Sequence, residues 1–308
     1  MSTHKYLIFS FLLLVSNFLY AQNYTFKVLA IKGNITADEK PLDVKGEFKA
    51  VQTLKINDDS SYIALYYAGK KEVLELTKKG VYAGQDLVKQ LNEAKAWESD
   101  FFYYTLGELT QENTLIQKGR QTVAPVMAML PLNEQKMYGT KIFLRWITLS
   151  QLPFKDKIAN YHVMVYDTQD NLLYYKDTKF YKTTLDFSGT KFSQQQILII
   201  QIIAVDSKGL DLAKNYKAES YRISRVEPEK VKEITLDLET IFKGRNRDTA
   251  FSKLAEARYF EDKKLPIDAM QAFEQALTLS FNAEAYKKSY RFFLERNGMY
   301  SAILDSSK

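Results

Sequence analysis

The side chains that could carry out chemistry are few in this chain. Its 308 residues include no cysteine and only two histidines. The lack of cysteine excludes disulfides, cysteine-ligated zinc, iron–sulfur clusters and a thiol nucleophile. His4 lies in an N-terminal segment that looks like a removed signal, so a Ser-His-Asp triad would have to use His162. A site with several histidine ligands is excluded for the same reason.

Carboxylates are the remaining candidates. The runs Asn57-Asp58-Asp59 and Asp167–Asn171 are the densest in oxygen ligands that calcium could use. We interpret both as hairpin turns, because Asp and Asn side chains satisfy turn backbone groups. Glu227 and Glu229 flank a proline at a predicted helix start, where acids favour the positive end of the helix dipole. We therefore predict no catalytic residue, no metal ligand and no cofactor.

Motif searches support a protein that is not an enzyme. The chain contains no G-x-S-x-G elbow, P-loop, G-x-G-x-x-G or H-E-x-x-H motif. His162 alternates with apolar neighbours on a predicted strand, which makes it an outward-facing residue on the surface or at a sheet edge. The basic run Lys243–Arg247 is predicted to be a solvated loop, with an acidic partner as the alternative.

The N-terminus has the features of an export signal. Met1–Ala21 combines Lys5, an apolar stretch from Tyr6 to Val15, and the small residue Ala21. Polar residues interrupt the stretch, and a spanning helix needs about 20 apolar residues, so cleavage before Gln22 is favoured over an uncleaved anchor. Without cysteine there is no lipobox. We expect a periplasmic or secreted protein that is not a lipoprotein.

Residues 24–87 alternate short strands with turns, which predicts a small all-β domain. The order of VLAIKGNIT, KPLDVKGEFKAVQTLKIND and SSYIALYYAGKKEVLELTKKGVYAG resembles the FecR-type periplasmic domain, with Gly33 and Gly46 at its turns. The membrane anchor and cytoplasmic segment of FecR-type sensors are not expected here, so their signalling role is not carried over.

Residues 88–120 are predicted to be a helical connector. Leu87, Leu91 and Trp97 share helical spacing, and the aromatic segment Asp100–Leu106 follows them. We interpret the aromatic residues as packing against the first domain. A ligand-stacking cluster is the alternative.

Residues 121–226 contain strands at intervals of about ten residues, which predicts a β-sandwich. The pattern resembles a fibronectin type III domain: Trp146 in the second strand, Tyr161-x-Val-x-Val in the third, and Ala204 and Gly209 at the penultimate strand and its turn. Leu198 replaces the usual core tyrosine of that strand. The resemblance implies a fold and no activity.

Residues 227–308 are predicted to be helical. Two helices meet at a turn near Lys264, and the second has the small-aromatic-small residues Ala269, Phe273 and Ala276. This pattern resembles a tetratricopeptide repeat, although Lys264 replaces the usual turn glycine. A generic helical hairpin with an alanine-aromatic seam is the alternative.

The combined prediction is a multidomain all-β plus all-α chain: a signal peptide over residues 1–21, a small β-domain, a connector, a β-sandwich and C-terminal repeat-like helical hairpins. The function that this order favours is a non-catalytic, exported cell-envelope interaction or scaffold protein with a protein partner. The alternative is a binding module for cell-wall glycan or another polysaccharide, and a carboxylate-based hydrolase is a third interpretation. The net charge of +6 is spread along the chain, so nucleic acid is not expected. Membrane attachment is expected only through an uncleaved signal.

Overall fold

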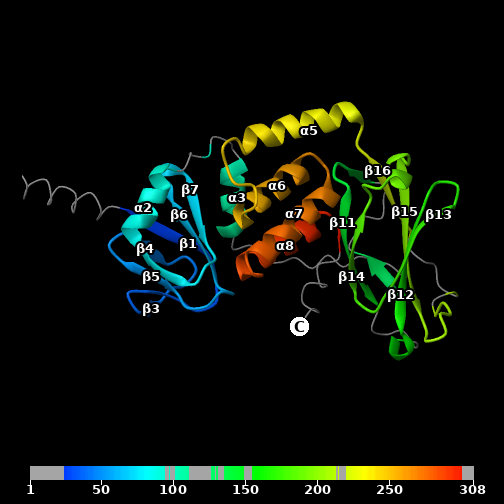
Figure 1. Cartoon of the computed structure of the whole chain (residues 1–308), viewed down its shortest axis with the longest axis horizontal. Helices are drawn as coiled ribbons and strands as arrows, with labels where there is room; N and C mark the ends of the chain where they lie inside the picture. The colour runs from blue at the N-terminus through cyan, green and yellow to red at the C-terminus, as the bar shows by residue number, and fades with distance from the viewer. Residues whose placement is uncertain are drawn as a thin grey trace, which may run out of the picture. The chain divides into compact units, whose positions relative to one another are not determined.

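The computed structural model describes residues 24–93, 97, 101–110, 126–128, 130, 135–148, 155–212, 214 and 220–299. The predicted signal peptide lies outside these residues. The described part combines four β-sheets with helices, so the chain has the mixed β and helical content of a multidomain protein (Figure 1). Within it, no helix is long and apolar enough to cross a membrane.

The chain divides into two compact units. Unit 1 consists of Met1–Gln111, Ile241–Ala255 and Gln275–Lys288. Unit 2 consists of Glu112–Thr240, Glu256–Glu274 and Ser289–Lys308. Both units therefore contain β-sheets together with residues from the C-terminal helices, which no sequence pattern indicated. The predicted domain boundaries stay predictions.

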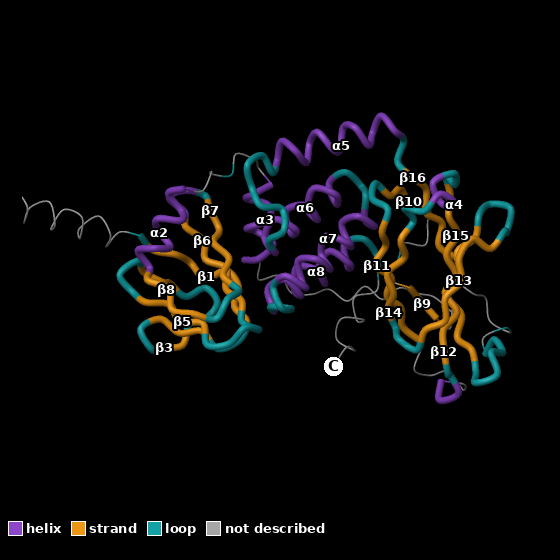
Figure 2. The backbone as a smooth tube through the Cα atoms, viewed as in Figure 1, coloured by secondary structure: helices purple, strands orange, loops and turns teal. Residues whose placement is uncertain are grey.

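Unit 1 contains two antiparallel four-stranded sheets (Figure 2). The strand order of the first is β4-β1-β6-β7 and that of the second is β3-β2-β5-β8. Their bounds are β1 (Thr25–Lys32), β2 (Ile35–Ala37), β3 (Lys40–Pro41), β4 (Glu47–Lys49), β5 (Thr53–Ile56), β6 (Tyr62–Tyr67), β7 (Glu72–Leu76) and β8 (Gly80–Ala83). A short 3₁₀ turn, Ala68–Lys70, joins β6 to β7.

The core of this unit lies between its two sheets. Phe26 and Ile63 come from the first sheet and Leu54 from the second, and all three are fully buried. Helix α2 (Gly84–Glu93) adds Leu87 and Leu91 to the same cluster. The helical spacing of these two leucines therefore reflects one buried face of an amphipathic helix.

The first sheet is buried on its other face as well. Leu29, Tyr62 and Ala64 are almost completely buried without belonging to the cluster between the sheets. Helix α3 (Phe101–Thr110) contributes Phe102, whose ring lies 5.8 Å from that of Tyr66. Phe102 of the aromatic segment thus packs against the first sheet, whereas Tyr103 and Tyr104 are exposed.

Gly33 is required where β1 turns into β2. Its φ of +85° is strained for other residues, and a Cβ atom there would lie 2.1 Å from the Ser61 Oγ atom. Gly46 has an ordinary backbone conformation, but a Cβ atom there would lie 2.9 Å from the Asp43 carbonyl oxygen. Both glycines therefore permit close packing at turns.

Unit 2 contains a three-stranded sheet, β14-β11-β9, and a five-stranded sheet, β10-β16-β15-β12-β13. The bounds are β9 (Val126–Ala128), β10 (Gln135–Met137), β11 (Lys141–Thr148), β12 (Asn160–Tyr166), β13 (Leu172–Thr178), β14 (Lys182–Asp186), β15 (Ile197–Val205) and β16 (Ser220–Arg225). Strands β10 and β16 are parallel, and the other pairs are antiparallel. Two short helical turns, η2 (Lys155–Lys157) and α4 (Thr190–Ser193), lie in the connections.

Residues from both sheets of unit 2 meet in its core. The Trp146 ring of β11 lies 5.5 Å from the Tyr161 ring of β12, and both side chains are buried. Ala204 on β15 is fully buried. Gly209 has a φ of +78° in the turn after β15, and its N–H donates to the Asp206 carbonyl oxygen.

Four helices follow the strands: α5 (Pro228–Ile241), α6 (Ala250–Asp262), α7 (Pro266–Leu279) and α8 (Glu284–Arg296). Helix α5 begins at Pro228, as the sequence predicted. Ala269, Phe273 and Ala276 are buried, and the Phe273 ring stacks on that of Tyr290 at 5.3 Å. Lys264 has a φ of +61°, which explains why a glycine would be expected in this turn.

His162 faces outward, as predicted, and its strand β12 lies inside the five-stranded sheet. One prediction of local structure was wrong. Asn57-Asp58-Asp59 is not a hairpin turn, because β5 and β6 belong to different sheets. The alternation of residues along a strand shows on which face of the sheet a side chain lies, but it does not show the order of the strands in the sheet.

Candidate functional site

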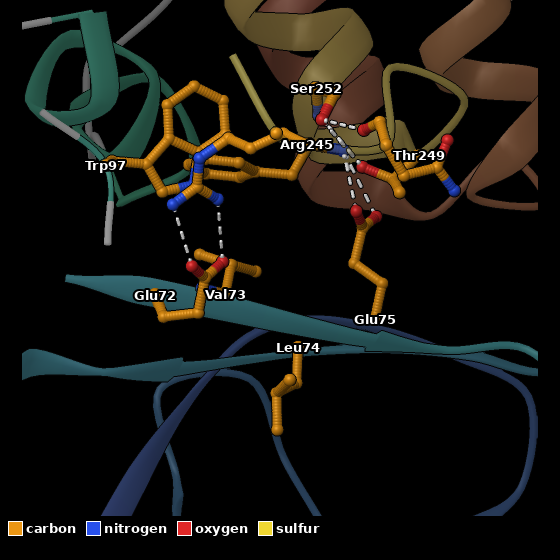
Figure 3. A pocket seen from close by; sticks show the side chains of 11 residues that line it. Glu72, Val73, Leu74, Glu75, Trp97, Arg245, Thr249 and Ser252 are labelled. Atoms are coloured by element: carbon orange, nitrogen blue, oxygen red, sulfur yellow. Dashed lines mark hydrogen bonds and ion pairs between the residues drawn. The ribbon is translucent and has the colours of Figure 1, made fainter. Parts of the chain in front are cut away.

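The candidate site of unit 1 is a cavity of about 240 Å³ beside the edge strand β7 (Figure 3). The residues that line it come from β7, from the segment before α3, and from the α5–α6 connection with the start of α6. They are Glu72, Val73, Leu74, Glu75, Trp97, Gly244, Arg245, Asn246, Thr249, Phe251 and Ser252. Ligand pockets usually have volumes of about 300–1,000 Å³, so this one suits water or a very small solute.

A buried ion pair forms one wall of the cavity. The Arg245 guanidinium donates to both oxygens of the Glu72 carboxylate, at 3.1 and 2.9 Å. It also lies over the Trp97 ring, 4.2 Å from the ring centroid, as Figure 3 shows. The two charged side chains are only 11% and 6% exposed. A planar guanidinium suits this combination of a bidentate partner and an aromatic face.

Glu75 forms the opposite wall and holds the start of helix α6. Its two carboxylate oxygens accept the Phe251 N–H at 3.1 and 3.2 Å. The Tyr62 hydroxyl also donates to Glu75, and the hydroxyls of Tyr62 and Tyr286 lie 2.7 Å apart. A carboxylate at a helix N-terminus satisfies amide groups that have no partner within the helix. Glu75 therefore links β7 to α6.

Glu72 and Glu75 both reach the cavity from β7. Figure 3 shows Glu75 pointing toward the α6 start, while Leu74 points to the opposite side, into the core between the sheets. The basic run Lys243–Arg247 was predicted to be a solvated loop, and this was wrong for Arg245. Its partner Glu72 precedes it by 173 positions, so no local pattern indicated that the charge would be buried.

Burial dominates the electrostatics of the cavity. Burial raises the pKa of Glu72, and the Arg245 charge opposes that rise. Burial also raises the pKa of Glu75, against the hydrogen bonds from Thr249, Tyr62 and Phe251. Each carboxylate is thus held by groups of its own chain. Such an arrangement stabilises a joint between a sheet and a helix.

Unit 2 contains a second set of buried carboxylates, on helix α7. Asp268, in the first turn of α7, accepts the N–H groups of Tyr138 and Gly139 at 2.8 and 2.7 Å. These donors lie in the turn between β10 and β11. Burial raises the pKa of Asp268 to about 6, with a further contribution from the nearby Glu256 carboxylate.

Further along α7, Glu274 forms a buried ion pair with a strand. Its carboxylate lies 2.9 Å from the Arg145 guanidinium of β11, and the side chains are 8% and 16% exposed. Burial raises the pKa of Glu274, and the Arg145 charge lowers it. Asp268 and Glu274 together fasten α7 to the three-stranded sheet and its preceding turn.

The acidic runs considered for calcium have structural partners within the fold. The Asp167 carboxylate accepts the N–H groups of Gln169 and Asn171 at 2.8 and 2.9 Å, which closes the β12–β13 hairpin. Asp58 accepts the N–H and the hydroxyl of Ser60. Among the described residues, no group of three or more histidine and acidic side chains is placed to hold a metal ion.

The predicted marker residues do not gather into one site. Gly33 and Gly46 lie at turns of unit 1, whereas Trp146, Tyr161, Ala204 and Gly209 belong to unit 2. Sequence reasoning missed Glu72 and Glu75. The available signal was two acids within the otherwise apolar strand EVLEL, which indicates that those acids have partners.

No family model matches the chain, and no curated protein matches it.

Proposed function

We propose that the chain is a non-catalytic interaction or scaffold protein of the bacterial cell envelope, exported through Met1–Ala21. The observation that carries the proposal is that the buried carboxylates bind groups of the protein itself. Glu72, Glu75, Asp268 and Glu274 are all bonded to groups that join helices to sheets. Polar groups arranged in this way maintain a rigid shape, which a scaffold needs and which offers no reacting group to a substrate.

The three family resemblances are part of this proposal. A fibronectin type III-like domain is supported by the two sheets of unit 2. One is three-stranded, the other contains β12, β15 and β16, and Trp146 is buried between them. The left-handed backbone at Lys264 and the buried Ala269 and Phe273 support a tetratricopeptide-like hairpin. The close approach at Gly33 supports a FecR-like turn.

Helix α5 is the element best suited to a protein partner. Only Ile234 and Leu238 of this helix are buried, and Leu236 is 64% exposed. Helices α6 and α7 have few exposed residues. An exposed large apolar side chain on a helix that is otherwise polar is a suitable anchor for a partner.

Site-specific crosslinking in cells tests the proposal. A photoreactive residue at position 236 should yield an adduct with one protein, and the same residue at exposed Val81 should not yield that adduct. Mature protein should begin at Gln22, as read by mass spectrometry. Identical adducts at both positions, or turnover in a broad glycosidase and esterase screen, would contradict the proposal. Deleting the C-terminal helices is a poor test, because Tyr62 and Glu75 would lose buried partners.

A further inference from the structure

The outward face of the five-stranded sheet in unit 2 carries a histidine, an aspartate and a tyrosine in contact. His162 on β12 pairs in register with Asp177 on β13, and the His162 Nε2 atom lies 3.1 Å from the Asp177 Oδ1 atom. The Tyr175 hydroxyl donates to the same Asp177 oxygen at 2.6 Å. The rings of His162 and Tyr175 meet edge to face, with their centroids 5.1 Å apart.

This cluster holds the Tyr175 ring in place while leaving it accessible. Tyr175 is 46% exposed, although its hydroxyl and one edge are both engaged. The hydrogen bond to Asp177 raises the pKa of Tyr175 to about 12, because the neutral hydroxyl is the donor in that bond. An aromatic ring fixed in this way loses little conformational freedom when a ligand stacks on it.

A row of side chains crosses the sheet in register with Tyr175, and its members on β15 and β16 are polar. Met164 of β12 is opposite Tyr175 on one side and Gln201 of β15 on the other, and Gln201 is opposite Ser220 of β16. The Gln201 amide nitrogen donates to the Ser220 hydroxyl at 2.8 Å. Neighbouring strands are about 4.8 Å apart, so this row extends over about 14 Å of sheet.

We propose that this face binds a polysaccharide whose sugars present flat, equatorially substituted rings, as β-linked glucans and peptidoglycan do. The apolar face of a sugar would stack on Tyr175, and its hydroxyls would bond to the neighbouring Asp177 carboxylate and to the amide and hydroxyl groups of the row. An open sheet face with a fixed aromatic ring and planar polar side chains matches this chemistry. An anionic lipid surface would instead require a basic cluster.

Polysaccharide binding on this face is separate from the protein partner proposed for α5, so either proposal can be contradicted without the other. The alternative occupants of the face are a protein and a lipid surface. Retention on a β-linked polysaccharide that is lost with Tyr175 supports the polysaccharide, and lack of retention on every β-linked probe would favour one of the other two occupants.

Retention of the full mature chain on polysaccharides tests the site. The probes are insoluble peptidoglycan sacculi, soluble β-glucan in affinity electrophoresis, and amylose as an α-linked comparison. Tyr175→Ala should weaken binding to a β-linked probe roughly tenfold, in the range expected for loss of an aromatic contact. Gln201→Ala should weaken it several-fold, and Tyr175→Phe should keep most of the affinity.

Phe180→Ala is the matched control. Phe180 is 71% exposed in the β13–β14 loop, so Phe180→Ala removes at least as much exposed aromatic surface as Tyr175→Ala and leaves the row unchanged. Its binding should stay within about twofold of the unchanged chain. The proposal is overturned by lack of retention on every β-linked probe, by preferential binding to amylose, or by equal losses for Tyr175→Ala and Phe180→Ala. Circular dichroism of each variant confirms that it is folded.

Discussion

The two units fasten C-terminal helices to β-sheets with buried carboxylates, but the carboxylates belong to opposite partners. In unit 1 they lie on strand β7 and bind the α5–α6 connection and the start of α6. In unit 2 they lie on helix α7 and bind strand β11 and the turn before it. We refer to these as the β7 joint (Glu72, Glu75, Arg245) and the α7 joint (Asp268, Glu274, Arg145).

The acids of the two joints have the same kinds of partner, but the surroundings of one acid in each joint differ. Each contains one ion pair with an arginine, and each contains one acid that accepts backbone N–H groups. In the β7 joint, Glu75 faces the positive N-terminal end of helix α6. In the α7 joint, Asp268 accepts hydrogen bonds from two amides of a turn and lies near another acid, Glu256. Because the pKa of Asp268 is about 6, the strength of the α7 joint should change with pH just below neutrality.

The largest effect is expected from breaking the ion pair of the β7 joint. Arg245→Ala should lower the free energy of unfolding by about 3–5 kcal/mol, because it leaves Glu72 buried without a countercharge. Urea unfolding followed by tryptophan fluorescence measures the loss. The exposed Lys243→Ala nearby should change stability by less than about 0.5 kcal/mol. A loss below about 1 kcal/mol for Arg245→Ala would show that Glu72 finds solvent or another partner.

The next effect concerns pH and the α7 joint. The pKa of Asp268 is about 6 in the fold against 3.8 for the free side chain, so the folded chain binds this proton more tightly than the unfolded chain does. Its contribution to stability is therefore full below about pH 4 and is lost as pH rises through 6, by about 3 kcal/mol at most. Unfolding measured from pH 4 to 7 should show this decline.

Asp268→Asn separates that residue from the other acids. Its amide oxygen can still accept an N–H group, but it carries no charge at any of these pH values. The decline between pH 4 and 7 should become shallower in this variant, whereas the exposed Asp262→Asn should keep the original slope. Parallel slopes in all three proteins would mean that Asp268 does not titrate in this range.

A smaller effect is expected from the hydroxyl that supports Glu75. Tyr62→Phe removes the bonds to Glu75 and Tyr286 while keeping the buried ring. The loss should be about 1–3 kcal/mol, because both partners stay buried with one hydrogen bond fewer. Tyr82→Phe is the control, since the Tyr82 hydroxyl bonds to the Lys78 carbonyl at the surface. Thermal unfolding of the two variants should differ, and equal midpoints would argue against a buried network in the β7 joint.

The smallest effect is a gain at the turn before α7. Lys264→Gly relieves a left-handed backbone that costs other residues about 1–2 kcal/mol, and the flexibility of glycine when unfolded offsets part of this. The net stabilisation should be up to about 1 kcal/mol by urea unfolding. Lys263→Gly should do the opposite, because Lys263 lies 2.9 Å from the Asp237 carboxylate. If Lys264→Gly destabilises the chain, the lysine side chain contributes more than its backbone costs.

Much of the local structure could be predicted from the sequence. The strand predicted to contain Leu198 and Ala204 and the helix start at Pro228 agree with β15 and α5. Both depend on short-range physics: β-branched residues favour strands, and proline fits the first turn of a helix. The strands β2, β3, β8, β9, β10 and β16 were missed. All except the six-residue β16 have two to four residues, which carry too little periodicity to distinguish a strand from a turn.

The candidate site could not be predicted in the same way. Arg245 was visible only as part of a basic run, and His162 only as an outward-facing residue with no acid beside it in the chain. Their partners Glu72 and Asp177 are brought to them by a helix–sheet contact and by the β12–β13 pairing. A charged residue is expected from the sequence to be solvated. Only the tertiary structure shows that it is buried and which opposite charge it pairs with.

The sequence alone determined which chemistries are closed to this chain, where most longer strands and helices lie, and which glycines occupy turns, since these depend on residue type and local spacing. Only the tertiary structure decided that helices α6 to α8 contribute to both units, that Glu72 and Asp268 are buried, and that Asp177 holds the half-exposed Tyr175 on the outward face of a sheet. Those features depend on contacts between residues far apart in the chain, and their strength comes from removing charged and polar groups from water.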